Sequence, residues 1–398
     1  MATLIIVIGV VLVLSGPTSA LCRQLGIPAS AGYILLGLFL GSVLRGTLGY
    51  SEAIDGGLAV LAQLGIVALL FHVGLKSHTS VLLDKLPAAS LIWVGNVALS
   101  ALAGYAVCRL MLDATVETSL IVAAAFSATS IAIAAAAWEE AGALESANGQ
   151  LLLDVAELDD LSAAIFLAVL VGVLMALENG EADITGRVLS ETATLLMKLL
   201  LFVAGCYVFA RYLEPRFTHF SARYDGTPAL RSLSILGMGL IIAASAGLLG
   251  FSLAIGALFA GLAFSRDPEA VREAGSFTYV YEFLTPFFFI YIGMQTDLLL
   301  VLDAWALGLI LLLAASLSKV IGTALPALLT MSRTDAITLG ISMVPRAEIA
   351  LVVLYEARAV DARYVSDELF AAMILLSLLT CILTPIAVRR RLAGAGAA

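Results

Sequence analysis

The sequence predicts an all-α protein that crosses a membrane many times. Of its 398 residues, 61% are hydrophobic and 13% are charged, a balance far from that of a soluble globular domain. Long apolar stretches alternate with short polar, Gly- or Pro-containing breaks, as expected for consecutive membrane-spanning helices. The few ionisable residues inside these stretches indicate an ion or proton path, because such groups are expensive in a bilayer. We therefore expect a transporter rather than an enzyme, with no nucleic-acid partner and no resident cofactor.

The apolar stretches divide the chain into about thirteen spans. The ninth is short and is separated from the eighth by only Leu249 and Gly250. The expected spans cover residues 3–22, 28–45, 57–76, 87–112, 116–138, 148–177, 190–212, 229–248, 251–265, 277–295, 303–329, 334–357 and 368–388.

The distribution of Lys and Arg predicts the orientation. With the N-terminus outside, thirteen of the 21 Lys and Arg residues fall inside and four outside, while four lie within spans. Positive residues favour the cytoplasmic side of a membrane. We therefore expect a multi-pass protein of the inner (plasma) membrane, with its N-terminus outside and its C-terminus in the cytoplasm.

An internal repeat is visible in the glycine pattern. The motif LG-x5-G-x4-GL occurs at residues 25–38 and again at 249–262, so every matched position is offset by 224 residues. The offset corresponds to seven spans, an odd number, so the two copies would face opposite ways. This predicts the inverted repeat of secondary transporters, with spans 1–6 repeated as spans 8–13 and span 7 as a connector. Because Leu and Gly are common residues, a chance recurrence is the alternative.

The repeat pairs the fifth span with the twelfth, and both carry residues that favour a break. Pro345 lies in the middle of the twelfth span, where its ring and missing N–H should interrupt the helix near Val344. Arg346 and Glu348 flank this break. A buried pair of this kind can stabilise the broken segment, and we favour that role over ion binding.

In the fifth span, Ser127, Thr129 and Ser130 gather at the centre. Such hydroxyls offer the backbone alternative hydrogen-bond partners. Two discontinuous helices at equivalent positions would leave half-helix ends near the midplane, where transporters bind ions. Hydrogen bonding between helices is the other interpretation of Thr129 and Ser130.

The sixth span contains four carboxylates in an otherwise apolar stretch. Asp159 and Asp160 lie on the order of 20 Å from its start, near the middle of a bilayer. Because neighbouring helical residues point about 100° apart, these two carboxylates face different neighbours. Asp154, Glu157 and Asp160 follow an i, i+3, i+6 stripe that could line a funnel from the cytoplasm.

The eleventh span supplies a cation for this centre. Lys319 and Lys198 are the lysines far from a span end, and Lys319 is a plausible partner for Asp159 or Asp160. A cation could displace this lysine from the carboxylate, and the lysine could then lose its proton. The alternative is a permanent ion pair that holds two helices together.

At these residues the chain resembles the monovalent cation/proton antiporter superfamily. It is most similar to the bacterial branch that contains sodium/proton and potassium-efflux antiporters. The matching stretches run in order over nearly the whole chain, at residues 26–41, 64–76, 126–134, 149–165, 248–265, 283–298, 318–328 and 343–353.

The resemblance implies a single transmembrane antiporter unit over residues 1–398 that assembles as a homodimer. The dimerisation side would comprise residues 1–76 and 229–295. A mobile core would comprise residues 87–177 and 303–388, in which the fifth and twelfth spans cross, with a linker helix at 190–212.

The resemblance also implies roles for single residues. Asp160 matches the aspartate that binds the cation, so the transported monovalent cation would contact Asp160 and Asp159. Asp159 matches the aspartate that pairs with a lysine, here Lys319. The remaining matches are Thr129 and Ser130 in an unwound segment beside the ion, and Arg346 and Glu348 near the second crossing.

Three positions depart from the family's usual pattern. Glu157 stands where an apolar residue is more usual, so it could add a titratable group, and we treat it with Asp154 as accessory. Lys76 and His72 stand where a glutamate and an apolar residue are more usual. We assign His72 no role, because such residues more often pack or form hydrogen bonds.

We expect exchange of a monovalent cation, Na⁺ in the first place, for protons across the bilayer. K⁺/H⁺ exchange is one alternative, and a Na⁺-coupled symporter of an organic solute is another. An intramembrane aspartyl protease needs two aspartates that face each other, whereas Asp159 and Asp160 are adjacent on one helix. In a passive cation channel, a buried Lys319 would be out of place.

Overall fold

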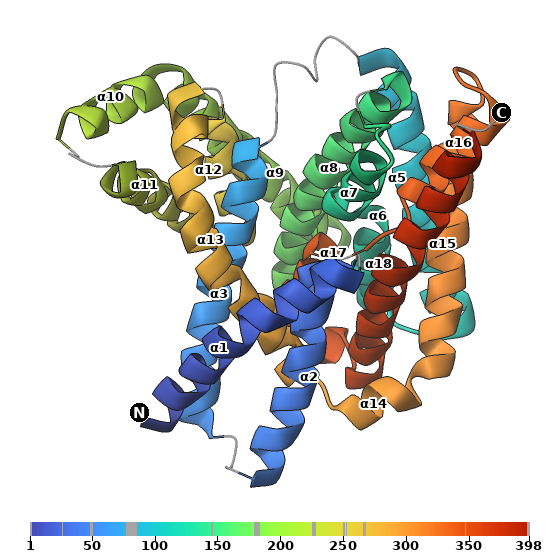
Figure 1. The fold of residues 1–398 in the computed structure, drawn as a ribbon, viewed down its shortest axis with the longest axis horizontal. Coiled ribbons are helices and arrows are strands. Elements are labelled where there is room, and N and C mark those ends of the chain that lie inside the picture. The colour runs from blue at the N-terminus through green and yellow to red at the C-terminus, as the bar shows by residue number, and fades with distance from the viewer. Residues whose placement is uncertain are drawn as a thin grey trace. The chain divides into compact units, whose positions relative to one another are not determined.

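A computed structural model describes residues 2–25, 27–47, 51–76, 86–144, 146–178, 184–224, 228–249, 251, 253–265, 268–346 and 348–395. All regular structure within these ranges is helical (Figure 1). The first half contains α1 (Ala2–Leu25), α2 (Ala29–Thr47), α3 (Glu52–Lys76), α5 (Leu86–Met111), α6 (Val116–Ser127), α7 (Ile131–Glu140), α8 (Ala147–Glu178) and α9 (Ile184–Val208). The second half contains a π-helical turn η1 (Phe209–Leu213), α10 (Glu214–Tyr224), α11 (Pro228–Leu248), α12 (Leu253–Phe264), α13 (Pro268–Met294), α14 (Leu298–Asp303), α15 (Trp305–Ala327), α16 (Arg333–Ser342), α17 (Glu348–Val360), a 3-10 turn η2 (Ala362–Tyr364) and α18 (Asp367–Ala395).

The helices form two compact units. The first comprises Met1–Leu12, Tyr50–Leu83 and Ala164–Tyr291, and so contains α3, α9–α12 and most of α13. The second comprises Val13–Gly49, Asp84–Ala163 and Ile292–Ala398. It contains α5–α7, the first half of α8 and α14–α18, and every residue of the candidate site lies in this second unit.

Several helices are long and apolar enough to cross a membrane. In the described part of the chain, five such stretches are Ala2–Leu25, Glu52–His72, Ala89–Met111, Trp305–Ala327 and Asp367–Leu392. Five shorter apolar helices accompany them. The chain is therefore a multi-pass membrane protein.

Most helices follow the predicted spans, and the differences have local causes. The stretch predicted at 190–212 belongs to a longer helical run from Ile184 to Tyr224. Its continuation α10 is polar, and the run lasts because Thr218 donates a hydrogen bond to the buried Glu214 at 2.7 Å. Likewise, α13 begins at Pro268 rather than at residue 277, because a proline is well suited to the first helical turn.

Two helical runs in the second unit are interrupted in their middles. Helix α6 ends at Ser127, where Ala128 is extended (φ −65°, ψ 152°), and α7 begins at Ile131. Helix α16 ends at Ser342, shortly before Pro345, and α17 begins at Glu348. The two interruptions contact each other, because the Ser130 N–H donates to the Pro345 carbonyl at 2.8 Å.

Close glycine contacts recur at the offset found in the sequence. A Cβ on Gly293 in α13 would collide with the backbone of Leu38 in α2. A Cβ on Gly74 in α3 would collide in the same way with the backbone of Leu262 in α12. Leu262 follows Leu38 by 224 residues, so the two helix crossings use equivalent positions of the repeated motif.

A backbone contact repeats at the same offset. After α1, the Ile27 N–H donates to the Cys22 carbonyl at 3.0 Å. After α11, the Phe251 N–H donates to the Ala246 carbonyl, also at 3.0 Å. Both partners are displaced by 224 residues, so the connections that lead into α2 and α12 have the same local geometry.

The helices α5 and α15 lie side by side along much of their length (Figure 1). They approach closely because two glycines face each other, and a Cβ on Gly95 or on Gly322 would lie 2.7 Å from the carbonyl of the other residue. This close contact brings Asn96 of α5 and Lys319 of α15 into the same buried region.

Candidate functional site

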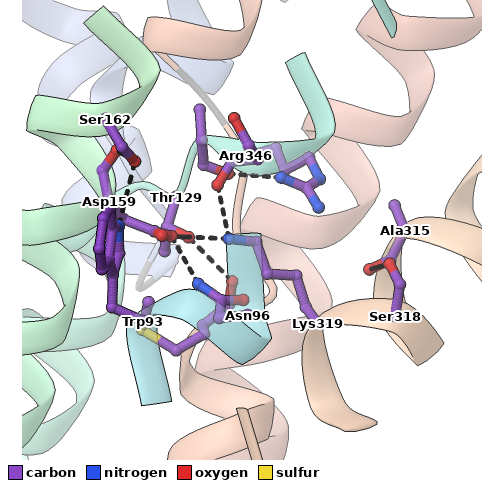
Figure 2. Close-up of polar contacts among 12 residues, drawn as sticks. Trp93, Asn96, Thr129, Asp159, Ser162, Ala315, Ser318, Lys319 and Arg346 are labelled. Carbon is purple, nitrogen blue, oxygen red and sulfur yellow. Dashed lines mark hydrogen bonds and ion pairs between the residues drawn. The ribbon is translucent and has the colours of Figure 1, made fainter. Parts of the chain in front are cut away.

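The site is built around Asp159, a fully buried carboxylate of α8 (Figure 2). Its Oδ2 accepts three hydrogen bonds from three different elements: from Lys319 Nζ at 2.6 Å, Thr129 Oγ1 at 2.6 Å and Asn96 Nδ2 at 2.8 Å. Its other oxygen, Oδ1, is buried and has no hydrogen-bond partner among the described residues. All three donors therefore converge on one oxygen and leave the second available.

Lys319 is fully buried in α15 and divides its ammonium between two acceptors. Besides the ion pair with Asp159, Nζ donates to the Ser127 carbonyl at 2.7 Å. Ser127 is the last residue of α6. The end of an interrupted helix carries unpaired carbonyls and partial negative charge, so it helps to hold the lysine cation in a dry environment.

A second buried cation, Arg346, occupies the same helix end. Its guanidinium donates to the carbonyls of Ala125 and Ala128 and lies 5.1 Å from the centre of the Phe126 ring. Arg346 is fully buried, and its Nε and Nη2 have no partner in the described part of the protein. The sequence placed Arg346 beside the break in the α16–α17 run, and the structure adds that it reaches the α6 carbonyls.

The backbone of the second interruption is held by α18. The Arg346 N–H donates to Thr380 Oγ1 at 3.2 Å, and Ser377 Oγ donates to the Arg346 carbonyl at 2.6 Å. On the other side, Trp138 Nε1 donates to Ser342 Oγ at 2.8 Å and so joins α7 to the end of α16. The backbone polar groups freed by the interruption thus have fixed partners, as buried groups require.

The two hydroxyl residues predicted in the unwound segment differ in what they contact. Thr129 Oγ1 lies 2.6 Å from Asp159 Oδ2 and 3.3 Å from the Met343 carbonyl, so its proton serves the shorter contact. Ser130 contributes its backbone N–H to the contact with Pro345. Both side chains are buried.

Helix α8 is oriented by a contact on the far side of Asp159. Ser162 Oγ donates to the Asp159 carbonyl at 2.8 Å, and Trp93 Nε1 of α5 donates to Ser162 Oγ at 3.2 Å (Figure 2). The indole therefore fixes α8 against α5 one turn from the carboxylate.

Several predicted residues are not brought into this cluster. Asp154 is half-buried on α8. The side chains of Asp160, Glu157 and Glu348 lie outside the described residues, as does that of Lys76. His72 stacks on Tyr281 in the first unit, with ring centres 4.3 Å apart.

Asn96 is the residue that sequence reasoning missed. It is fully buried, and its amide donates to the same carboxylate oxygen as the lysine. An asparagine in the middle of the long apolar helix α5 was the available signal, because a buried amide needs a partner.

Chemically, the cluster can hold one positive charge against a carboxylate and exchange it for another. The lysine has a second acceptor at Ser127, and neutral donors remain on Asp159 when the lysine moves away. A buried carboxylate and lysine at interrupted helices in a multi-pass membrane protein define an ion-coupled transporter.

Comparison with known proteins identifies the family. A family model described as the transmembrane sodium/hydrogen exchanger matches residues 10–393, so the chain belongs to this family. This match confirms the resemblance expected from the sequence and, with it, cation/proton exchange as the activity. A symporter of an organic solute is not favoured.

The chain is also similar to curated antiporters. It is 26% identical over 333 residues to the high-affinity Na⁺/H⁺ antiporter NhaS3 of Synechocystis sp., which covers 82% of this chain and 70% of that relative. It is 25% identical over 371 residues to the Na⁺/H⁺-K⁺ antiporter GerN of Bacillus cereus, which covers 91% of this chain and 89% of GerN. These relatives are named as antiporters, which are transporters rather than enzymes.

Its fold is similar to that of the sodium/proton antiporter MjNhaP1 from Methanocaldococcus jannaschii. The TM-score is 0.73 over 99% of this chain and 97% of that one, at 16% sequence identity. The all-helical fold predicted from the sequence is therefore confirmed.

Proposed function

We propose that this protein exchanges Na⁺ for protons by alternating access, with Asp159, Asp160 and Lys319 as the coupled groups. One observation carries the proposal: the buried 2.6 Å ion pair between Lys319 and Asp159, in which the lysine has a second acceptor at the end of α6. A purely structural pair needs no such alternative. In the proposal, the transported cation competes with protons for Asp160, and Asp159 alternates between Lys319 and the cation.

The proposed cycle couples proton release to cation entry. When a cation approaches from the side that is open, Lys319 moves from Asp159 towards the Ser127 carbonyl and gives up its proton. Thr129 and Asn96 keep Asp159 hydrogen-bonded during this step. If Asp160 and Lys319 each release one proton per Na⁺, exchange is electrogenic, and each net charge contributes about 2.3 kcal/mol per 100 mV of membrane potential.

We extend the proposal to the architecture in the membrane. It comprises thirteen spans in an inverted repeat, with α6–α7 crossing α16–α17, the N-terminus outside and the C-terminus cytoplasmic in the inner membrane. Two protomers would pair through a dimerisation side (residues 1–76 and 229–295), beside a mobile core (residues 87–177 and 303–388) and a linker helix (residues 190–212). The equivalent glycine crossings at Leu38 and Leu262 support the repeat. Glu157, Asp154, Arg346 and Glu348 are accessory in this scheme, which uses transported ions and no resident cofactor.

The test is exchange by purified protein in proteoliposomes with an internal pH dye. A pH gradient is imposed, the membrane potential is clamped, and Na⁺, K⁺ and Li⁺ are added in turn. Na⁺ should dissipate the gradient, Asp160→Asn should abolish the response, and Asp303→Asn, an exposed residue in α14, should retain it. A normal Na⁺ response in D160N would refute the assignment of Asp160.

Two further outcomes sharpen the result. A response to K⁺ alone would replace Na⁺ by K⁺ as the substrate, the alternative that the name of GerN supports. Lys319→Gln should lower the number of protons moved per cation, whereas Lys198→Gln in α9 should not. An unchanged stoichiometry in K319Q would show that the Lys319–Asp159 pair is only structural.

A further inference from the structure

Asn96 in α5 is the one neutral amide at the centre of the described site, and the proposed function gives it no required step. We propose that Asn96 is a positioning residue that holds Asp159 in its ionised form and thereby sets the pH range of exchange. This inference rests on the proposed function, which it deepens by naming the residue that tunes the coupled carboxylate.

The geometry of Asn96 singles it out from the other polar residues of α5. Its side chain is fully buried, and Nδ2 donates to Asp159 Oδ2 at 2.8 Å. Its Oδ1 is also buried, and no described residue donates to it. Ser100, one turn further along the same helix, is equally buried but makes no hydrogen bond to Asp159. Only the donor N–H of Asn96 is engaged, so its partner is the charged form of the carboxylate.

The position of Asn96 is fixed independently of the lysine. The close contact between Gly95 and Gly322 holds the backbone beside Asn96 against α15. Two residues earlier, Trp93 holds α5 to α8 through Ser162. The amide is therefore pre-positioned by helix packing, and it stays in place when Lys319 moves.

A neutral donor at this point acts differently from the lysine. An amide N–H stabilises a carboxylate without carrying a charge that the transported cation must displace. Removing it has two effects of the same sign: Asp159 takes a proton more readily, and the remaining charge holds Lys319⁺ more tightly. Both effects keep protons in the site to a higher pH, so exchange should begin at a more alkaline pH.

The charged and titratable groups around Asp159 come from every helix packed against it. Lys319 from α15 contacts it directly, and Arg346 from the second interruption acts on it electrostatically. On α5, the titratable residues Tyr105, Cys108 and Arg109 lie more than two turns beyond Asn96. The remaining groups are Asp154, Glu157 and Asp160 on α8 itself and Glu348 at the start of α17. All of these stay unchanged in the variants below, so a shift reports the loss of the amide.

The first experiment measures the pH dependence of cation-driven proton flux for wild-type protein, Asn96→Leu and Asn96→Ser in proteoliposomes. Leucine has a similar branched shape but no donor, and serine is too short to reach Asp159. Both variants should move the pH of half-maximal exchange upwards by about one unit, as expected for one lost hydrogen bond to a charged group, while the maximal rate at alkaline pH stays near that of wild type. Ser100→Ala should not shift the profile, and Asn96→Gln, which keeps an amide, should shift it less than leucine does.

A second measurement does not depend on transport. Infrared titration follows the protonated-carboxyl band that Asp159→Asn removes, and the pH at which this band disappears should rise in N96L and N96S but not in S100A. If both Asn96 variants lower the rate equally at every pH and leave the band unshifted, Asn96 only packs and the inference is wrong. If wild-type protein moves protons with no cation, the proposed function fails, and the infrared shift alone then supports or refutes the hold of Asn96 on Asp159.

Discussion

Replacing Lys319 by methionine should destabilise the protein strongly, because it leaves Asp159 buried without its cation. Lys319 Nζ makes two contacts, to Asp159 Oδ2 at 2.6 Å and to the Ser127 carbonyl at 2.7 Å, and both partners are buried. Removing one member of a buried ion pair costs about 3–5 kcal/mol. Since Asn96 and Thr129 still donate to Asp159, we expect the lower end, about 3 kcal/mol.

The double variant K319M/D159N separates charge from packing. It removes the uncompensated carboxylate, so it should be more stable than K319M alone by about 2 kcal/mol. Stability is measured as the free energy of unfolding in one detergent, with titrated denaturant and a fluorescence readout. Lys198→Met, a half-buried lysine of α9, is the matched control and should change stability by no more than about 0.5 kcal/mol.

The loss in K319M should also depend on pH. Burial disfavours the charged carboxylate, so Asp159 in this variant can accept a proton under acidic conditions and become neutral. The destabilisation should therefore shrink as the pH falls from 8 to 5 and grow as it rises. A loss of stability that is independent of pH, and that D159N does not relieve, would refute the view that an unpaired charge is the cause.

Three further variants test other contacts of the second unit and the glycine crossings. Thr129→Val removes the 2.6 Å hydrogen bond to Asp159 and should lower cation-driven exchange by roughly tenfold, whereas T129S should retain most of it in the same proteoliposome assay. Arg346→Gln takes the guanidinium from the end of α6 and should lower the unfolding free energy by about 2–4 kcal/mol, with a smaller loss in R346K. Gly74→Ala places a methyl group against the backbone of α12 and should cost about 1–3 kcal/mol. Gly56→Ala on the same helix meets open space and should be neutral or slightly stabilising, so equal losses in the two alanine variants would refute the crossing argument.

The fold class could be predicted because membrane insertion imposes strong rules on sequence. A chain with so few charges in long apolar stretches can satisfy its backbone only as helices or a closed barrel, and the lengths and spacing of the stretches favour helices. Pro345 indicates where α16 must end, since its missing N–H cannot continue the ladder. The extension of α9 into the polar α10 could not be predicted, because it depends on the buried contact between Glu214 and Thr218 rather than on hydropathy.

Parts of the site follow from scarcity. Few ionisable groups lie inside the spans, so Lys319 was expected beside Asp159 or Asp160, and its Nζ lies 2.6 Å from Asp159 Oδ2. Asn96 carries no charge that demands a partner, and its contact with Asp159 depends on how closely α5 approaches α15 at Gly322. The reach of Arg346 to the carbonyls of α6 likewise depends on tertiary structure.

The repeat explains why the scaffold is regular while the site is not. Equivalent positions support the helix crossings in both halves, but the two interruptions meet at a contact that cannot be reciprocal. The Ser130 N–H donates to the Pro345 carbonyl, and a proline has no N–H to return. The cations Lys319 and Arg346 come from the second half of the chain, and both donate to the end of α6 in the first half. This asymmetry collects positive charge at one helix end, where a single carboxylate oxygen can exchange its partner while the surrounding helices keep their packing.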